Sequence, residues 1–145
     1  FRNLTIRMLI APIIFVLFLV FARAEKAAIT VKGVVLCQGK EVRGVFVELF
    51  EQDMSITSKI DSDDFLATMA TPGNGAFAVT GHEDEFFKVA FYVRFTHRCD
   101  TKTGYRRITR YPVPREKHNR IYDMGFVSLD IYTEHDERDY DARLD

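Results

Sequence analysis

Tryptophan is absent from this sequence, and cysteine occurs only twice among its 145 residues. No long segment shows the 3.6-residue hydrophobic period of an amphipathic helix, and we find no internal repeat and no interdomain linker. These absences argue against helical bundles and repeat architectures and are typical of one domain. The formal net charge is only −1, so no basic excess indicates a nucleic-acid partner.

The first 24 residues differ in composition from the rest of the chain. Arg2 and Arg7 accompany an apolar run from Met8 to Ala22, and Ala22-Arg23-Ala24 is the small-x-small pattern that signal peptidase accepts. We therefore predict a signal peptide over residues 1–24, cleaved after Ala24, and a secreted, extracellular protein. An uncleaved membrane anchor is the alternative. It is less favoured because the apolar run is shorter than the roughly 20 residues of a spanning helix.

The remainder of the chain alternates between apolar and polar residues, which predicts short strands. The predicted strands cover residues 29–37, 45–49, 65–69, 77–79, 89–99, 105–111 and 121–132. Thr71-Pro-Gly-Asn-Gly75 is a dense turn signal, and residues 81–86 could form one short helical turn. The polar residues 52–64 form a connection whose conformation the pattern does not define. We expect an all-β, antiparallel sandwich or barrel over residues 25–133, followed by a charged, disordered tail over residues 134–145.

The clearest strand, FYVRFTHRCD at residues 91–100, ends in a histidine and a cysteine on one face. A period of two places His97 and Cys99 on the same side as the phenylalanines of this strand. Three interpretations are open: a disulfide with Cys37, a metal site, or a reactive thiol with a histidine base. We favour the disulfide, because export exposes the protein to oxidation and a zinc site needs three or four ligands. By closing a long loop, such a bridge would stabilise the folded domain by roughly 4 kcal/mol.

Five stretches in a fixed order resemble the nematode transthyretin-like family of small secreted proteins. They are VKGVVLCQGKEVRGVFVELFEQD (31–53), GNGAFAVTG (73–81), FYVRFTHRC (91–99), RRITRYPVP (106–114) and YDMGFVSLD (122–130). The resemblance implies a transthyretin-like, immunoglobulin-like β-sandwich of seven or eight strands with at most one short helix. It also implies a disulfide between Cys37 and Cys99, and neither a metal nor a cofactor. The second cysteine pair of many members is missing here.

We expect a non-enzymatic binding protein that acts at cell surfaces or in extracellular fluid. A first alternative is a carrier of a small apolar ligand in a channel of a homo-oligomer. A second is a hydrolase related to 5-hydroxyisourate hydrolase. That reaction is disfavoured because the chain ends in RDYDARLD rather than a Tyr-Arg-Gly-Ser tail, and its first strand has no histidine.

A basic region from residue 94 to residue 120 supplies the candidate binding face. Alternation predicts that one outward face carries Tyr92, Arg94 and Arg98 on one strand and Arg106 and Arg110 on its neighbour. Such a face could bind a cell-surface protein, anionic lipid headgroups or sulfated glycans. A simpler interpretation, which we favour for the arginines themselves, is a solvated sheet face with the acidic tail folded over it.

Overall fold

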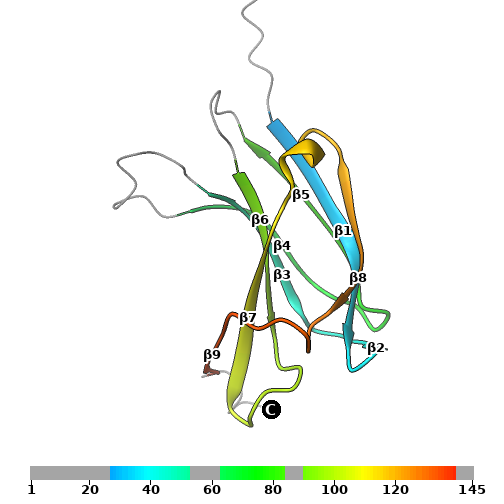
Figure 1. The fold of residues 1–145 in the computed structure, drawn as a ribbon, viewed down its shortest axis with the longest axis vertical. Helices are drawn as coiled ribbons and strands as arrows, with labels where there is room; N and C mark the ends of the chain where they lie inside the picture. The colour runs from blue at the N-terminus through cyan, green and yellow to red at the C-terminus, as the bar shows by residue number, and fades with distance from the viewer. Residues whose placement is uncertain (1–26, 53–62, 84–89, 140–145) are drawn as a thin grey trace, which may run out of the picture.

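Strands of alternating apolar and polar residues form two sheets that pack against each other (Figure 1). The computed structural model describes residues 27–52, 63–83 and 90–139. The four-stranded sheet contains β1 (Ala27–Cys37), β2 (Lys40–Glu41), β5 (Ala76–Glu83) and β8 (Ile121–Ser128). The five-stranded sheet has the order β4-β3-β6-β7-β9, made of β3 (Phe46–Gln52), β4 (Asp64–Ala70), β6 (Ala90–His97), β7 (Tyr105–Pro112) and β9 (His135–Arg138). The predicted β-sandwich is confirmed, with nine strands in the described residues instead of seven or eight.

The core lies between the two sheets and is built from the inward face of each strand. Its members are Ile29, Val31, Val35, Val45, Val47, Leu49, Phe77, Val79, Phe91, Val93, Phe95, Cys99, Val113, Val127 and Leu129. The Phe95 ring is fully buried and makes edge contacts with Phe77 at 5.3 Å and Tyr111 at 5.7 Å between ring centroids. Burying a side chain of this size contributes about 1.5–3 kcal/mol, so this inward row fixes the orientation of β6.

Glycine is required at the turns that bring the strands into register. Gln38 and Gly39 both have positive φ, 50° and 76°, as a two-residue turn between β1 and β2 requires. Gly75 ends the Thr71–Gly75 turn with a φ of 65°, and a Cβ there would lie 2.6 Å from the Val35 carbonyl oxygen. A side chain at residue 75 would therefore collide with the β1 backbone.

The pairing of β8 with β1 is parallel, whereas the sequence pattern predicted antiparallel neighbours only. The chain leaves β7, passes through the 3-10 turn η1 (Arg115–Lys117) and enters β8 in the same direction as β1. Hydrophobic alternation carries no information on strand direction, so this feature had no sequence signal. β8 also ends at Ser128, before the predicted limit at residue 132.

The prediction of a disordered tail is wrong for residues 135–138, which form β9 at the edge of the five-stranded sheet. β9 pairs antiparallel with β7, with Glu137 opposite Arg106 and Asp136 opposite Arg107. Opposite charges along the β7–β9 ladder explain why these residues form a strand, and a hydrophobic pattern does not detect such charges. The signal peptide and Ala24, residues 53–62, the segment 84–89 and the last six residues lie outside the described residues, and 81–83 belong to β5. No helix in the described part of the chain is long and apolar enough to cross a membrane.

Candidate functional site

The outward face of β6 and β7 brings the arginines of the candidate binding face together. The register places Arg94 directly opposite Arg110 and Tyr92 opposite Pro112. Arg98 follows the end of β6, and Arg106 lies near the start of β7, at the end of the sandwich that carries the disulfide. β3 continues the face on the other side, because Glu48 lies opposite Arg94.

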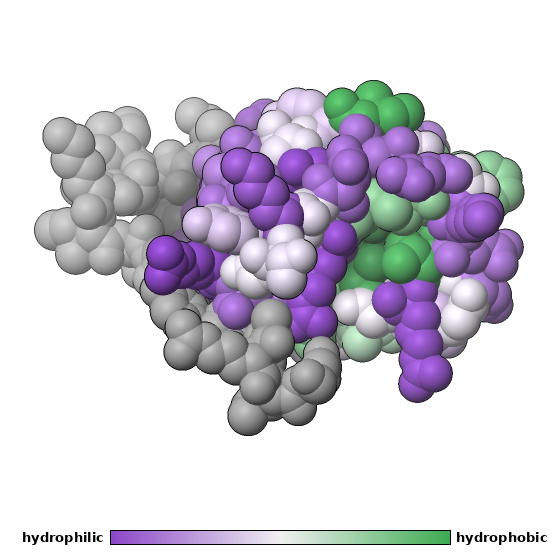
Figure 2. All heavy atoms as spheres, turned by 90° about the horizontal axis from the view of Figure 1, so that it is seen from below, coloured by the Kyte–Doolittle hydropathy of each residue, from purple (hydrophilic) through white to green (hydrophobic). Residues whose placement is uncertain are grey.

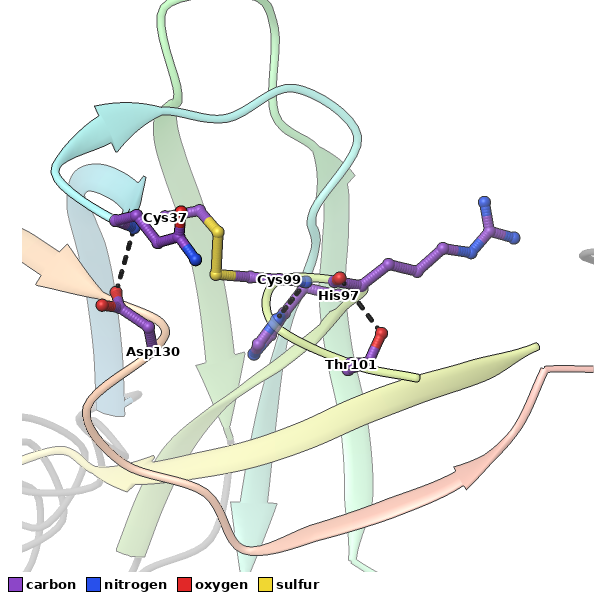
Figure 3. Close-up of a disulfide and its surroundings, with 7 residues drawn as sticks. Cys37, His97, Cys99, Thr101 and Asp130 are labelled. Atoms are coloured by element: carbon purple, nitrogen blue, oxygen red, sulfur yellow. Dashed lines mark hydrogen bonds between the residues drawn. A yellow bond between two sulfur atoms is a disulfide. The ribbon is translucent and has the colours of Figure 1, made fainter. Parts of the chain in front are cut away.

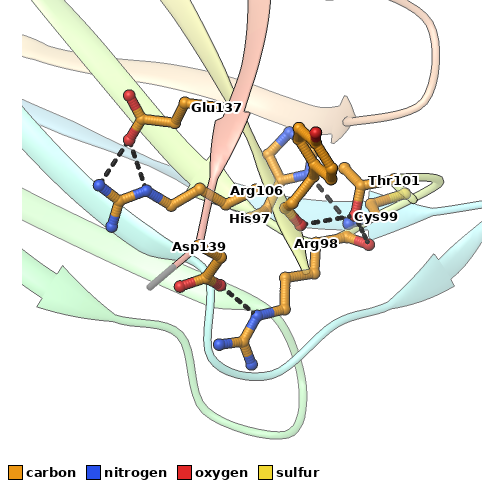
Figure 4. Close-up of polar contacts among 8 residues, drawn as sticks. His97, Arg98, Cys99, Thr101, Arg106, Glu137 and Asp139 are labelled. Carbon is orange, nitrogen blue, oxygen red and sulfur yellow. Dashed lines mark hydrogen bonds and ion pairs between the residues drawn. The ribbon is translucent and has the colours of Figure 1, made fainter. Parts of the chain in front are cut away.

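Each of these arginines is paired with a carboxylate, so the face is not an unpaired cationic surface. Three of the carboxylates come from the acidic tail, in agreement with the simpler interpretation favoured from the sequence. Arg94 donates from Nε and Nη2 to the two carboxylate oxygens of Glu48, at 2.9 Å and 3.0 Å. The other ion pairs are Arg98–Asp139, Arg106–Glu137, Arg107–Asp136 and Arg110–Glu134. Figure 4 shows the Arg98 and Arg106 pairs, whose carboxylates come from β9 and the residue after it. Five arginines face five carboxylates, so these pairs carry no net formal charge.

An aromatic cluster lies beside the ion pairs on the same face. The Phe50 ring stacks on Tyr92 at 5.2 Å with 9° between the ring planes, and the Arg94 guanidinium lies 4.5 Å from the Phe50 centroid. The Tyr92 hydroxyl donates to Asp63 at 2.8 Å. Burial, together with this bond to a carboxylate, raises the pKa of Tyr92 to about 12. The Tyr92 phenol therefore keeps its proton at physiological pH.

Two aromatic side chains of this face remain accessible. Phe65 makes an edge contact with Phe50 yet is 55% exposed, and Phe46 on β3 is 56% exposed. Phe46 lies opposite Thr96 in the register, on the same outward face as the arginines. Aromatic side chains and arginine are the residue types most enriched at the centres of protein interfaces.

The disulfide between Cys37 and Cys99 closes one end of the sandwich (Figure 3). It uses both cysteines, with 5.7 Å between the Cα atoms, as the resemblance implies. Cys99 therefore has no thiol, which excludes the reactive-thiol interpretation. The turn after Cys37 is held by a bond from the Gln38 N–H to Asp130 at 3.2 Å.

His97 is a buried, neutral histidine. Its Nδ1 accepts a hydrogen bond from the Cys99 backbone N–H at 3.1 Å, which leaves the ring proton on Nε2. Burial, reinforced by the positive charge of Arg107, lowers the pKa of His97 to about 4. Within residues 27–52, 63–83 and 90–139, no three histidine, cysteine, aspartate or glutamate side chains lie close enough to hold a metal ion.

A recess of about 620 Å³ opens beside the disulfide. Its apolar residues include Val42, Val45 and Phe46, and its charged residues include Arg43, Arg98, Asp100, Arg106 and Asp139. Figure 2 looks onto this end of the molecule and shows hydrophobic atoms in a hollow with a hydrophilic border. The volume is within the range of small-molecule sites.

Comparison with known proteins identifies the family. The sequence model of the transthyretin-like family matches residues 32–114, more than half of the chain. The chain belongs to the transthyretin-like family.

Three transthyretin-like relatives from Caenorhabditis elegans illustrate the similarity. Transthyretin-like protein 16 is 43% identical over 104 residues, which cover 71% of this chain and 75% of the relative. Transthyretin-like protein 5 is 35% identical and covers 68% and 73% of the two chains, and transthyretin-like protein 33 is 30% identical and covers 85% and 91%. A solved 9R-lipoxygenase from Cyanothece aligns with 72% of this chain and 16% of its own, at 16% identity and a TM-score of 0.42, a likeness too low to support an argument.

Two ion-paired residues next to this face, Glu48 and Arg107, were missed at the level of sequence. Glu48 is separated from Arg94 by 46 residues, and only the β3–β6 register brings them together. Arg107 lies on the inward parity of β7 and forms two hydrogen bonds with Asp136, which lower the pKa of that carboxyl. The acidic tail was expected to fold over the arginines, but its composition did not show which carboxylate pairs with which arginine.

Proposed function

We propose that this protein is a secreted, non-enzymatic binding protein that acts at cell surfaces or in extracellular fluid by contacting a protein receptor. The candidate binding face, defined by Tyr92, Arg94, Arg98, Arg106 and Arg110 with the exposed Phe46 and Phe65, would make the contact. The apolar, small-x-small pattern of residues 1–24 and the disulfide support an extracellular location, because cytosolic proteins rarely keep disulfides.

The observation that carries the proposal is the pairing of every arginine on this face with a carboxylate. An anionic membrane or glycan is attracted by net positive charge, and charge balance removes that attraction. A protein receptor gains instead from fixed, alternating charges and from accessible aromatic rings. Phe46 and Phe65 supply such rings, each more than half exposed. The geometry thus favours a protein receptor over the anionic surfaces considered from sequence.

The test is binding of the fluorescently labelled, secreted protein to cells of the source organism. We expect saturable binding that is lost when the cells are treated with protease and is kept after removal of sulfated glycans. Replacing Phe46 and Phe65 by serine should weaken binding about tenfold or more, which is the loss expected for interface hot spots.

The matched control is Phe126→Ser. Phe126 is 73% exposed but belongs to β8 of the other sheet, so this change should leave binding intact. Equal loss in the control and in the Phe46 and Phe65 variants would contradict the choice of face. Tight binding to vesicles of anionic lipid, or to heparin, would contradict the choice of a protein receptor.

A second candidate function, carriage of a small apolar ligand, is favoured by the recess beside the disulfide. In place of an oligomer channel, the described residues of one chain offer a hollow of about 620 Å³ with Val42 and Val45 in its lining. Native mass spectrometry of the secreted protein tests this idea. A carrier would show excess mass that disappears in a Val42→Glu variant, whereas a pure receptor ligand would show the mass of the chain alone.

A further inference from the structure

The strand β9 is held by polar interactions alone. Its residues, His135 to Arg138, include no aliphatic or aromatic hydrocarbon side chain, and the side chains of Asp136 and Glu137 are 35% and 36% exposed. Strands are normally anchored by burial of an apolar face, which gives most of the energy that opposes local unfolding. β9 lacks this anchor, so its attachment depends on backbone hydrogen bonds and charge.

Two of the four register positions between β9 and β7 place an acid opposite an arginine. Asp136 receives hydrogen bonds from Arg107 Nε at 2.7 Å and from Nη2 at 3.1 Å. Glu137 pairs with Arg106, and Glu134, just before the strand, pairs with Arg110 at 3.1 Å. Figure 4 shows how Glu137 lies over the Arg106 guanidinium from the neighbouring strand.

Beyond β9, Asp139 continues the series. Its carboxylate is 5% exposed and lies 2.6 Å from Arg98 Nε, and its backbone N–H donates to the Gly104 carbonyl at 2.9 Å. The arginines of β7 and Arg98 therefore contact an extended segment, residues 134–139, whose acids have the spacing acid-x-acid-acid-x-acid.

We infer that the β7 edge is an acceptor for an extended acidic segment of a protein partner, and that β9 is the resident segment that this partner replaces. The inference rests on the proposed function, because it names the chemistry of the protein partner. The arginines of β7, together with Arg98, select carboxylates with this spacing, and the β7 backbone supplies the hydrogen bonds of an added strand.

Exchange is physically accessible because the resident strand and the incoming one make the same interactions. No apolar surface of the four β9 residues has to be re-exposed when β9 leaves, and ion pairs this exposed are weakened by salt. The resident strand has the advantage of being tethered, which is equivalent to a local concentration in the millimolar range for a short linker. A partner must therefore bind tightly, or loosen β9 first.

The test uses the whole chain and a labelled synthetic peptide with the sequence of residues 131–139, IYTEHDERD. A second peptide, IYTQHNQRN, replaces each carboxylate by its amide. Both peptides are added to the wild-type protein and to a triple variant, Glu134→Gln, Asp136→Asn and Glu137→Gln. The variant keeps the shape of the resident segment and removes these three negative charges. We expect the acidic peptide to bind the triple variant at least tenfold more tightly than the wild type, and to lose most of this binding between about 50 mM and about 500 mM salt.

Two further variants sharpen the result. Adding Arg106→Glu and Arg107→Glu to the triple variant should abolish peptide binding, because both arginines then repel the carboxylates. Equal binding of the amide peptide, or no gain in the triple variant, would overturn the inference.

Hydrogen exchange on the wild type provides a test that needs no variant. A large excess of acidic peptide should reduce the protection of the His135–Arg138 amides while β7 amides stay protected, and unchanged protection of β9 would overturn the inference. Receptor binding without peptide exchange would refute the inference and leave the proposed function standing. Peptide exchange without any receptor on cells would refute the proposed function and leave the acceptor role of the β7 edge standing.

Discussion

Removal of the disulfide should strongly destabilise the domain. Cys37 and Cys99 are 62 positions apart, so the bridge closes a long loop in the unfolded chain. The chain-entropy relation for a loop of that length gives about 4 kcal/mol at 25 °C. A domain of this size has a total free energy of unfolding of about 5–15 kcal/mol. The double variant Cys37→Ala, Cys99→Ala should therefore lose a large share of its stability.

Urea unfolding followed by far-ultraviolet circular dichroism is the appropriate assay, because the chain has no tryptophan to report by fluorescence. We expect the free energy of unfolding to fall by about 4 kcal/mol and the denaturant slope to rise, since an unfolded chain without the cross-link exposes more surface. Reduced wild-type protein is the control and should unfold close to the double variant. A double variant as stable as the oxidised protein, with an unchanged slope, would refute the loop-entropy reasoning.

Three further outcomes concern the residues near the candidate site. Because folding lowers the pKa of His97 from 6.5 to about 4, the unfolded chain binds a proton first as the pH falls. The wild type should thus lose about 3 kcal/mol of stability between pH 6.5 and pH 4 that His97→Gln does not lose; parallel pH profiles of the free energy of unfolding would contradict this. A double-mutant cycle on Arg94→Ala and Glu48→Ala, measured by urea unfolding, should give a coupling energy of about 1 kcal/mol, because the pair is bidentate and partly buried; additive losses would refute it. Tyr92→Phe should remove one phenol that titrates near pH 12, and a spectrophotometric difference titration with its midpoint near pH 10 would show that burial does not hold this proton.

Much of the fold could be read from the chain because strand alternation is a local property. The stretch from Phe91 to Cys99 shows its inward and outward residues without any knowledge of its neighbours. The outward position of Arg94 followed from the same period. The turn at Gly75 was equally local, since few residues other than glycine and asparagine tolerate its backbone conformation.

The candidate site could be predicted only in part. Alternation shows the parity of the arginines, but the net charge of their face depends on carboxylates far away in the chain, such as Glu48 and the acids of β9. β9 has no hydrophobic signal, so its pairing with β7 depends on a register that composition does not contain. The state of His97 likewise depends on burial between two sheets.

Three properties followed from the order of residues: which side chains point inward, where the chain turns, and that two cysteines were available for one bridge. These properties depend on backbone sterics and on a period of two, which act over a few residues. Three features depend on tertiary contacts: the parallel direction of β8 beside β1, the pairing of each carboxylate of the tail with its own arginine, and the recess beside the disulfide. Each of these depends on contacts between residues far apart in the chain, whose registers are set by the packing of the whole core.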